Sequence, residues 1–336
     1  MPSQSKPHTH SIPSTPSAFL PPSILHTLTL PFSFLILGTS IAAAFPFVTS
    51  ASPQSDVRNT KQKHTKPNDS TDQPHILYTI PLSHYALLAR WLLRLSKTPV
   101  TEVPLAPVYH SLYTLRNSKG KSRTVPQLLL PSGHLLTSST EIISYVEEKQ
   151  GMEWLFPNEE ARTMCDELGR DMGPALRAFL YVHFMGSKEG CGKLVGILGN
   201  RRYLSGWQAW LVRATFPAMR TVMIKSIDLD NPKTFQTSLS TIQSHITKLD
   251  AILATQPYLA GQQLSAADIT LACLCYPFVF GEESADLLDC TTTPALDDRG
   301  IPESLRTEVQ WFRETRTGQH VVKILKGAGR EALVPW

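Results

Sequence analysis

The sequence has no marked excess of charge of either sign. Its 32 Lys plus Arg stand against 28 Asp plus Glu, a net charge of +4, so neither nucleic acid nor an anionic membrane surface is the expected partner.

Cysteine is scarce as well. The five cysteines are odd in number and scattered, which excludes a disulfide-stapled scaffold and indicates a reducing compartment. Cys273 and Cys275 are two residues apart on a predicted helix and point to different faces, so no metal site is expected.

Residues 1–74 lack Trp and Tyr, and no Asp, Glu, Lys or Arg occurs between Lys6 and Asp56. The same segment holds 11 of the 26 prolines and 21 Ser plus Thr. Such a composition buries too little apolar surface to offset the entropy lost on folding. We therefore expect residues 1–74 to be a disordered targeting leader.

A hydrophobic run over residues 28–48 lies within this leader and has about the length of a membrane span. Two interpretations are open. The run is either the apolar region of a signal peptide, cleaved after the small residues Ala42 to Ala44, or a retained membrane anchor. The helix-breaking residues Pro31, Gly38 and Pro46 favour cleavage.

The segment from Phe45 to Pro74 has the composition of a transit peptide, since it is rich in Ser, Thr and basic residues and has three acidic ones. The junction of Ala42 to Ala44 with Phe45 also resembles plastid-targeting presequences of algae with complex plastids. The expected location is therefore an organelle, with the plastid as first candidate. A membrane-anchored or cytoplasmic protein is the alternative.

The pattern of residues 75–150 predicts a mixed α/β domain. Short β-rich runs at 75–80, 100–105, 125–130 and 135–136 indicate four strands, the last two joined as a hairpin around Gly133. Apolar periodicity predicts one helix after Ser83 and another from Ser138 or Ser139 to about Lys149. A further helix between the second and third strands is left open.

Residues 151–336 are predicted to form an all-α domain, because β-type patterns disappear after Pro157. The helical patterns cover about 158–184, 206–226, 233–255, 265–280 and 303–326. The lengths of the two predicted domains are ordinary for globular proteins.

Three motifs, in this order, resemble the soluble glutathione transferases. They are Leu77 to Arg90, with its strand, turn and helix; Val125-Pro126 followed by Leu135 to Val146; and Tyr258 to Ala272, which is similar to a helix-capping signature. The resemblance implies an α+β thioredoxin-like domain followed by an all-α helical bundle. It also implies glutathione as co-substrate, an electrophilic small molecule as second substrate and a homodimer as candidate assembly.

The resemblance further implies a set of site residues. Ser83 takes the position of the catalytic hydroxyl, with Tyr78 and Tyr85 as less favoured hydroxyls. The glutathione-binding residues would be Ser83, Lys121, Arg123, Val125, Pro126, Ser138 and Ser139, with a cis peptide before Pro126 that exposes the backbone of Val125. A hydrophobic substrate site is expected near Tyr181, His183 and Phe184.

Each of these residues also has a plain structural interpretation. Ser83 and Ser139 are suitable helix caps, and Lys121 and Arg123 are ordinary loop charges. Ser265 and Asp268 have the spacing of a capping box, for which we expect a folding role and no catalytic one.

The sequence departs from the family pattern in two ways. Ser138 stands where an acidic or amide residue usually precedes the conserved serine, and residues 186–204 and 282–301 are unfamiliar stretches. Two functions therefore compete. The first is a glutathione transferase-like enzyme that activates glutathione as a thiolate, and the alternative, supported by Ser138, is a non-catalytic binding protein of the same fold.

The glycine-rich segment 186–194 only superficially resembles a phosphate-binding loop. Its glycine spacing is wrong, and Leu194 stands where Ser or Thr would bind magnesium. A reductase with a cysteine nucleophile is disfavoured because residues 75–139 contain no Cys.

Overall fold

The structure is a computed structural model that describes residues 74–80, 83–201, 203–279 and 301–327. The predicted leader up to residue 73, including its hydrophobic run 28–48, and the stretch 282–300 lie outside the described residues. Within the described residues, no helix combines the length and apolar character needed to cross a membrane.

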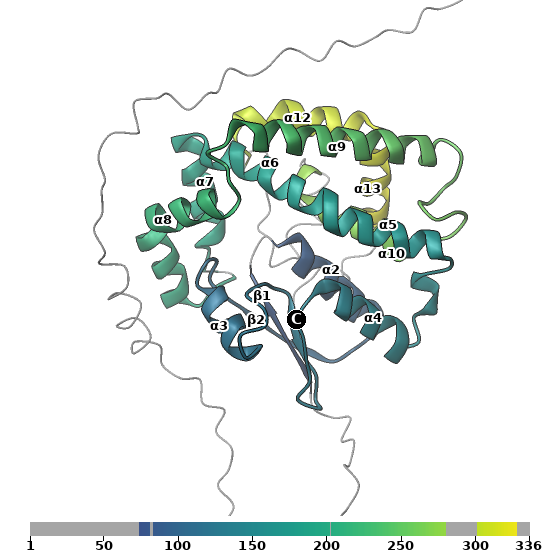
Figure 1. The fold of residues 1–336 in the computed structure, drawn as a ribbon, viewed down its shortest axis with the longest axis horizontal. Coiled ribbons are helices and arrows are strands. Elements are labelled where there is room, and N and C mark those ends of the chain that lie inside the picture. Colours follow the sequence, from purple (N-terminus) through teal and green to yellow (C-terminus); the bar gives the residue numbers. More distant parts are fainter. Residues whose placement is uncertain (1–73, 81–82, 202, 280–300, 328–336) are drawn as a thin grey trace, which may run out of the picture. The chain divides into compact units, whose positions relative to one another are not determined.

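Residues 74–150 form a small sheet with three helices (Figure 1). The described strands are β1 (His75–Thr79), β2 (Val100–Pro104), β3 (Gln127–Leu129) and β4 (Leu135–Leu136). The helices are α2 (His84–Leu95), α3 (His110–Asn117) and α4 (Ser139–Lys149). The helix that the sequence left open is therefore α3.

The strand order of the sheet is β2-β1-β3-β4. β2 runs parallel to β1, with His75 opposite Val100, while β3 is antiparallel to both β1 and β4. Parallel neighbours need a crossover connection, and α2 supplies it between β1 and β2.

Helices cover both faces of this sheet. Successive side chains of a strand point to opposite faces, so the contacts of two neighbouring residues of β1 show which helix lies on each face. The ring of Tyr78 contacts Tyr113 of α3, with 5.3 Å between centroids. The neighbouring Thr79 donates to Glu102, which pairs with Arg90 of α2. α3 and α2 therefore lie on opposite faces.

The rest of the described chain is helical. Its elements are η2 (Glu153–Leu155), α5 (Glu159–Glu167), the π-helical turn η3 (Leu168–Met172), α6 (Gly173–Met185), α7 (Lys188–Leu198), α8 (Gly206–Ser226), α9 (Pro232–Leu253), α10 (Ala266–Cys275), η4 (Tyr276–Phe278), α12 (Glu303–Glu314) and α13 (Arg316–Gly327). The predicted fold class, a thioredoxin-like α+β part followed by an all-α part, is confirmed. The boundary predicted at residue 150 stays a prediction.

The sequence missed two features of the helical part. α7 lies in the stretch 186–204, for which no helix was predicted, and the single pattern at 303–326 is two helices that separate at Thr315. Thr315 begins the second helix by accepting the N–H of Gly318 at 2.9 Å. An added Cβ at Gly318 would overlap the carbonyl oxygen of Phe312, so the tight bend requires glycine.

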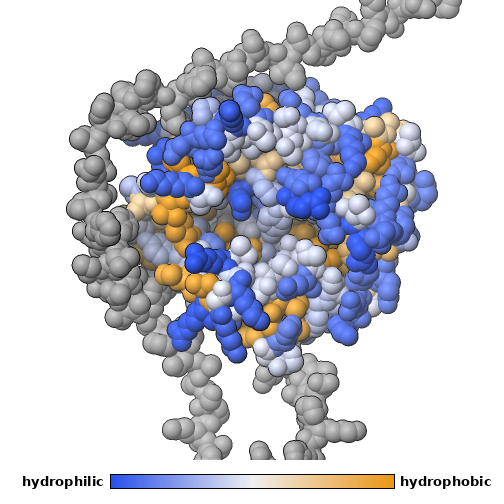
Figure 2. All heavy atoms as spheres, viewed as in Figure 1, coloured by the Kyte–Doolittle hydropathy of each residue, from blue (hydrophilic) through white to orange (hydrophobic). Residues whose placement is uncertain are grey.

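One hydrophobic core runs through both parts. It includes Leu77 and Trp91 from the α/β part and Leu176, Leu271 and Val321 from the helices. α10 is buried at every position, and it packs against α2 on one side and α5 and α13 on others. Figure 2 shows a largely hydrophilic surface, with hydrophobic residues gathered over α7 and α8.

Candidate functional site

The predicted glutathione-binding segments meet at one edge of the sheet. β1 and β4 both run antiparallel to β3, so the C-terminal ends of β1 and β4 lie beside the N-terminal end of β3. Ser83 follows β1, Val125 and Pro126 precede β3, and Ser138 follows β4. The strand topology therefore brings three segments together that are far apart in sequence.

Ser83 is the N-cap residue of α2. Its backbone is extended, and its Oγ accepts the N–H of Ala86 at 3.2 Å. Capping uses a lone pair of the hydroxyl and leaves the proton available, and no described residue accepts that proton. The capping role and a donor role are thus compatible in one side chain.

The peptide bond between Val125 and Pro126 is cis, as the sequence predicted. Pro126 is buried and Val125 half-buried at the start of β3. Lys121 and Arg123, in the loop before this bond, are exposed. Both cations are thus in the loop that leads into the site. Their role in binding glutathione stays a prediction.

Ser138 is the N-cap of α4, and Ser139 is the first residue of that helix. The Ser138 Oγ accepts the N–H of Glu141 at 3.1 Å, and the Glu141 carboxylate accepts the N–H of Thr137 at 2.6 Å. Side chains thus satisfy one of the free N–H groups in the first turn of α4, that of Glu141, and the N–H of Thr137 just before the N-cap. The residue that departs from the family pattern therefore has a capping role of its own.

Residues beside Ser83 tie this site to the helical part, which the sequence did not reveal. The Tyr85 hydroxyl donates to the carbonyl of Gly169 at 2.7 Å, within the π-helical turn. Gly173 lies so close that an added Cβ would overlap the Tyr85 hydroxyl. These contacts join segments 84 residues apart, so no local motif indicates them.

His84, the residue between Ser83 and Tyr85, is buried, with its ring edge-on to Tyr85 at 4.4 Å between centroids. Burial and the nearby Arg177 cation lower its pKa to about 3. A neutral imidazole therefore lies beside Ser83, and its Nε2 has no hydrogen-bond partner among the described residues.

The three residues predicted to form the hydrophobic substrate site do not share one environment. Phe184 and His183 are buried in the core, and His183 packs on Phe179 and contacts Ser304 at 3.0 Å. Burial lowers the pKa of His183 to about 4. Tyr181 is half-buried and lies near Arg177, whose charge opposes the rise in the Tyr181 pKa caused by burial. The substrate-site role stays a prediction, and this packing favours Tyr181 among the three.

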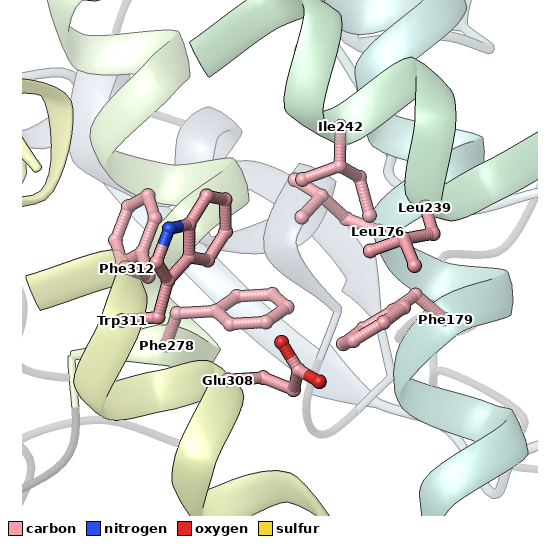
Figure 3. Close-up of a pocket in the computed structure, with 8 residues that line it drawn as sticks. All are labelled: Leu176, Phe179, Leu239, Ile242, Phe278, Glu308, Trp311 and Phe312. Atoms are coloured by element: carbon pink, nitrogen blue, oxygen red, sulfur yellow. The ribbon is translucent and has the colours of Figure 1, made fainter. Parts of the chain in front are cut away.

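Figure 3 shows a small cavity among α6, α9, η4 and α12. Its walls are Leu176, Phe179, Leu239, Ile242, Phe278, Trp311 and Phe312, together with the carboxylate of Glu308. Partial burial raises the pKa of Glu308. None of the predicted glutathione-binding residues lines it.

The predicted capping box at the start of α10 is present. Asp268 is fully buried and accepts both the N–H and the hydroxyl of Ser265, at 3.0 and 2.7 Å. It also accepts the N–H of Leu259 at 2.9 Å and contacts His320 Nε2 at 2.8 Å. The sequence did not indicate His320, which comes from α13, 52 residues away.

The glycine-rich segment 186–194 is the start of α7. Ser187 caps the helix by accepting the N–H of Gly190 at 2.9 Å. An added Cβ at Gly190 would overlap the carbonyl oxygen of Phe184, so this glycine permits close helix packing. Across the described residues, no group of three His, Cys, Asp or Glu side chains is placed to hold a metal ion.

Two protein-family models match the chain. The model described as "Glutathione S-transferase, N-terminal domain" matches residues 77–154, and the one described as "Glutathione S-transferase, C-terminal domain" matches residues 232–298. The chain thus matches the models of both domains of the glutathione S-transferase family. Residues 155–231, which include α7 and α8, lie between the two matches.

Several solved glutathione S-transferases have a similar structure at low sequence identity. One from Xanthobacter autotrophicus is 16% identical with a TM-score of 0.42, covering 60% of this chain and 82% of that one. One from Methylobacillus flagellatus, solved with glutathione bound, is 13% identical with a TM-score of 0.44, covering 78% of this chain and 100% of that one. Poplar glutathione transferase F1 is 14% identical with a TM-score of 0.41, covering 76% and 99%. No curated protein sequence matched the chain.

Proposed function

We propose that this glutathione S-transferase-like protein is an enzyme that adds glutathione, as its thiolate, to electrophilic small molecules. The observation that supports the proposal is Ser83: its hydroxyl proton has no acceptor among the described residues, and it lies at the N-terminus of α2 beside the cis peptide of Pro126. In this proposal Val125, Ser138 and Ser139 hold the peptide, and Lys121 or Arg123 meets its glycine carboxylate.

The chemistry requires a lower pKa for the glutathione thiol. A free thiol has a pKa of about 8.5, so only a few per cent is ionised at neutral pH. The Ser83 hydroxyl can donate to the sulfur while the partial positive charge at the start of α2 stabilises the same anion. The thiolate then forms a C–S bond to the electrophilic carbon; in a chloronitrobenzene the C–Cl bond breaks and chloride leaves with the bonding electrons.

The test compares wild type with Ser83→Ala and the matched variant Ser187→Ala, all in the full chain. Both variants lose a helix cap worth about 1 kcal/mol, but only Ser83 borders the proposed site. We expect retention on immobilised glutathione and turnover of a chloronitrobenzene in wild type. In Ser83→Ala, turnover should fall about tenfold or more at neutral pH, and less at high pH where solvent base ionises the thiol.

A loss of equal size at every pH, or the same loss in Ser187→Ala, would contradict the donor role. A wild-type protein that binds glutathione without turnover would favour the second candidate, a non-catalytic binding protein. Ser138, which replaces an acidic or amide residue, is the observation that favours it.

Localisation is a separate proposal that rests on the sequence alone. We propose that residues 1–74 direct the protein to an organelle, with the plastid as first candidate. A fusion of these residues to a fluorescent protein would test this. Fluorescence confined to the cytosol, or to a membrane in which the fusion remains anchored, would contradict it.

A further inference from the structure

Arg177 occupies the side of α6 that faces the start of α2. Gly173 touches Tyr85, and Arg177 and Tyr181 follow Gly173 at steps of four residues, which keeps them on neighbouring positions of one helix side. Arg177 is exposed and Tyr181 half-buried. The Arg177 guanidinium therefore lies near the first turn of α2.

The electrostatic effects of Arg177 agree with this position. Its charge adds to burial in lowering the pKa of His84, and it opposes the effect of burial on the pKa values of Tyr85 and Tyr181. All three are neutral around pH 7, so none of them balances the cation.

No described residue forms an ion pair or hydrogen bond with Arg177. Three other arginines do have a carboxylate partner: Arg90 pairs with Glu102, Arg162 with Glu147, and Arg170 with Asp171. The exposed Arg123 and Arg316 resemble Arg177 in having no partner among the described residues, but neither follows Gly173 on α6. A guanidinium beside a reactive centre and without a carboxylate partner is suited to an acid group of a ligand, which it can bind through two parallel hydrogen bonds.

Two sources of such an acid group exist, glutathione itself and the second substrate. The proposed holders of the glutathione carboxylates lie in the loop before β3 and at the start of α4. Arg177 belongs to neither of these segments: it lies on α6 of the helical part, where Gly173 touches Tyr85, two residues after Ser83. The second substrate is therefore the better source.

We propose that Arg177 binds a carboxylate of the second substrate, so that the enzyme prefers electrophiles that carry an acid group. This inference rests on the proposed function. In the reaction of a chloronitrobenzoate, the thiolate forms a C–S bond to the ring carbon, the C–Cl bond breaks, and chloride leaves with the bonding electrons. The neutral phenol of Tyr181 can donate a further hydrogen bond to the bound carboxylate.

The experiment compares a chloronitrobenzoate with the corresponding chloronitrobenzamide, which lacks the charge. The full-length variants are Arg177→Gln, Arg177→Lys and, as a matched charge-removing control, Arg316→Gln on α13, which packs against α9 and α10. For Arg177→Gln we expect kcat/KM for the benzoate to fall about tenfold or more, mainly through KM, with less than about a twofold change for the benzamide.

Arg177→Lys should recover part of the benzoate activity, and Arg316→Gln should behave as wild type on both substrates. Equal losses on both electrophiles, a weaker affinity for glutathione, or no loss at all in Arg177→Gln would overturn the inference while leaving the proposed function intact. If wild type conjugates neither electrophile, the proposed function itself fails. Melting temperatures, expected to be unchanged, exclude a folding effect.

Discussion

Glu102 and Arg90 form an ion pair in the interior of the α/β part, with side-chain exposures of 4% and 1%. Burial alone would raise the pKa of Glu102, but the charge and hydrogen bonds of Arg90 and the hydroxyl of Thr79 outweigh it and lower the pKa. The carboxylate therefore stays ionised although it is buried. A surface pair such as Arg162 and Glu147 lacks this isolation from solvent.

Glu102→Gln should lower the free energy of unfolding by about 3–5 kcal/mol, because it leaves the buried Arg90 without its counter-ion. Urea unfolding at neutral pH measures the change. The control is Glu147→Gln, where a loss below about 1 kcal/mol is expected for a more exposed pair. Similar losses in both variants would show that burial of the first pair has no special effect on stability.

The same pair gives an acid dependence with a definite sign. The folded-state pKa of Glu102 lies below its ordinary value of 4.5, so its stabilisation is complete above that value and is lost as the pH falls through the lowered pKa. Unfolding curves between neutral and acid pH should show a smaller loss of stability in Glu102→Gln than in wild type. Parallel curves for the two proteins would contradict this assignment.

Asp268 gathers four hydrogen-bonding groups from the start of α10, the preceding loop and α13. Asp268→Ala should therefore cost about 3 kcal/mol or more, beyond the effect of a helix cap alone. Thermal melting measures the loss, and Asp268→Asn, which keeps the shape, should lose less. Glutathione affinity per folded molecule should be unchanged; unaltered stability with lost activity would place Asp268 in the chemistry.

Among the secondary-structure elements, those with strong periodicity could be predicted from the sequence. The alternating strands and the capped, amphipathic α2 and α4 were found, since their signals are local. α7 was not, because glycines at 190, 192 and 196 lower its intrinsic helix propensity. Packing against α6 stabilises it instead, and packing cannot be read from local sequence.

Two glycines of α7 allow that explanation to be tested. Gly190→Ala should destabilise the protein, since the new Cβ would overlap the carbonyl oxygen of Phe184. Gly192→Ala should stabilise it by about 0.5–1 kcal/mol, because it is exposed with nothing within 4 Å of the new Cβ. Denaturant unfolding gives both values. The same sign for both variants would mean that Gly190 is not closely packed.

The residues of the candidate site also fall into two groups, those that local sequence predicts and those that only packing determines. Ser83, Val125 and Ser138 could be found because each lies at the end of a locally recognisable strand or helix. The bond from Tyr85 to Gly169 and the position of Arg177 depend on how the two parts of the chain pack. Such contacts have no signature in a single sequence.

Considered as a whole molecule, the described chain has one continuous hydrophobic core whose members extend from Leu77 to Leu325. Both the α/β part and the helices contribute to it, and α10 contacts both. We expect the two parts to unfold together.

Removing residues 1–73 should leave a protein that melts in a single cooperative transition and still binds glutathione, because the core begins at Leu77. Differential scanning calorimetry and glutathione-affinity retention measure the two properties. The full chain is the control. Aggregation of the shortened chain, or two separate transitions, would show that the first 73 residues contribute to folding.

The contact between Gly173 and Tyr85 has a consequence for how this protein can evolve. Any side chain at 173 meets the phenol of Tyr85, which is itself held by the carbonyl of Gly169. The constraint has one direction: a lineage that acquires alanine at 173 must first have exchanged Tyr85 for a smaller residue, whereas a smaller residue at 85 leaves glycine at 173 acceptable. Relatives that carry a side chain at 173 should therefore have a residue smaller than tyrosine at 85.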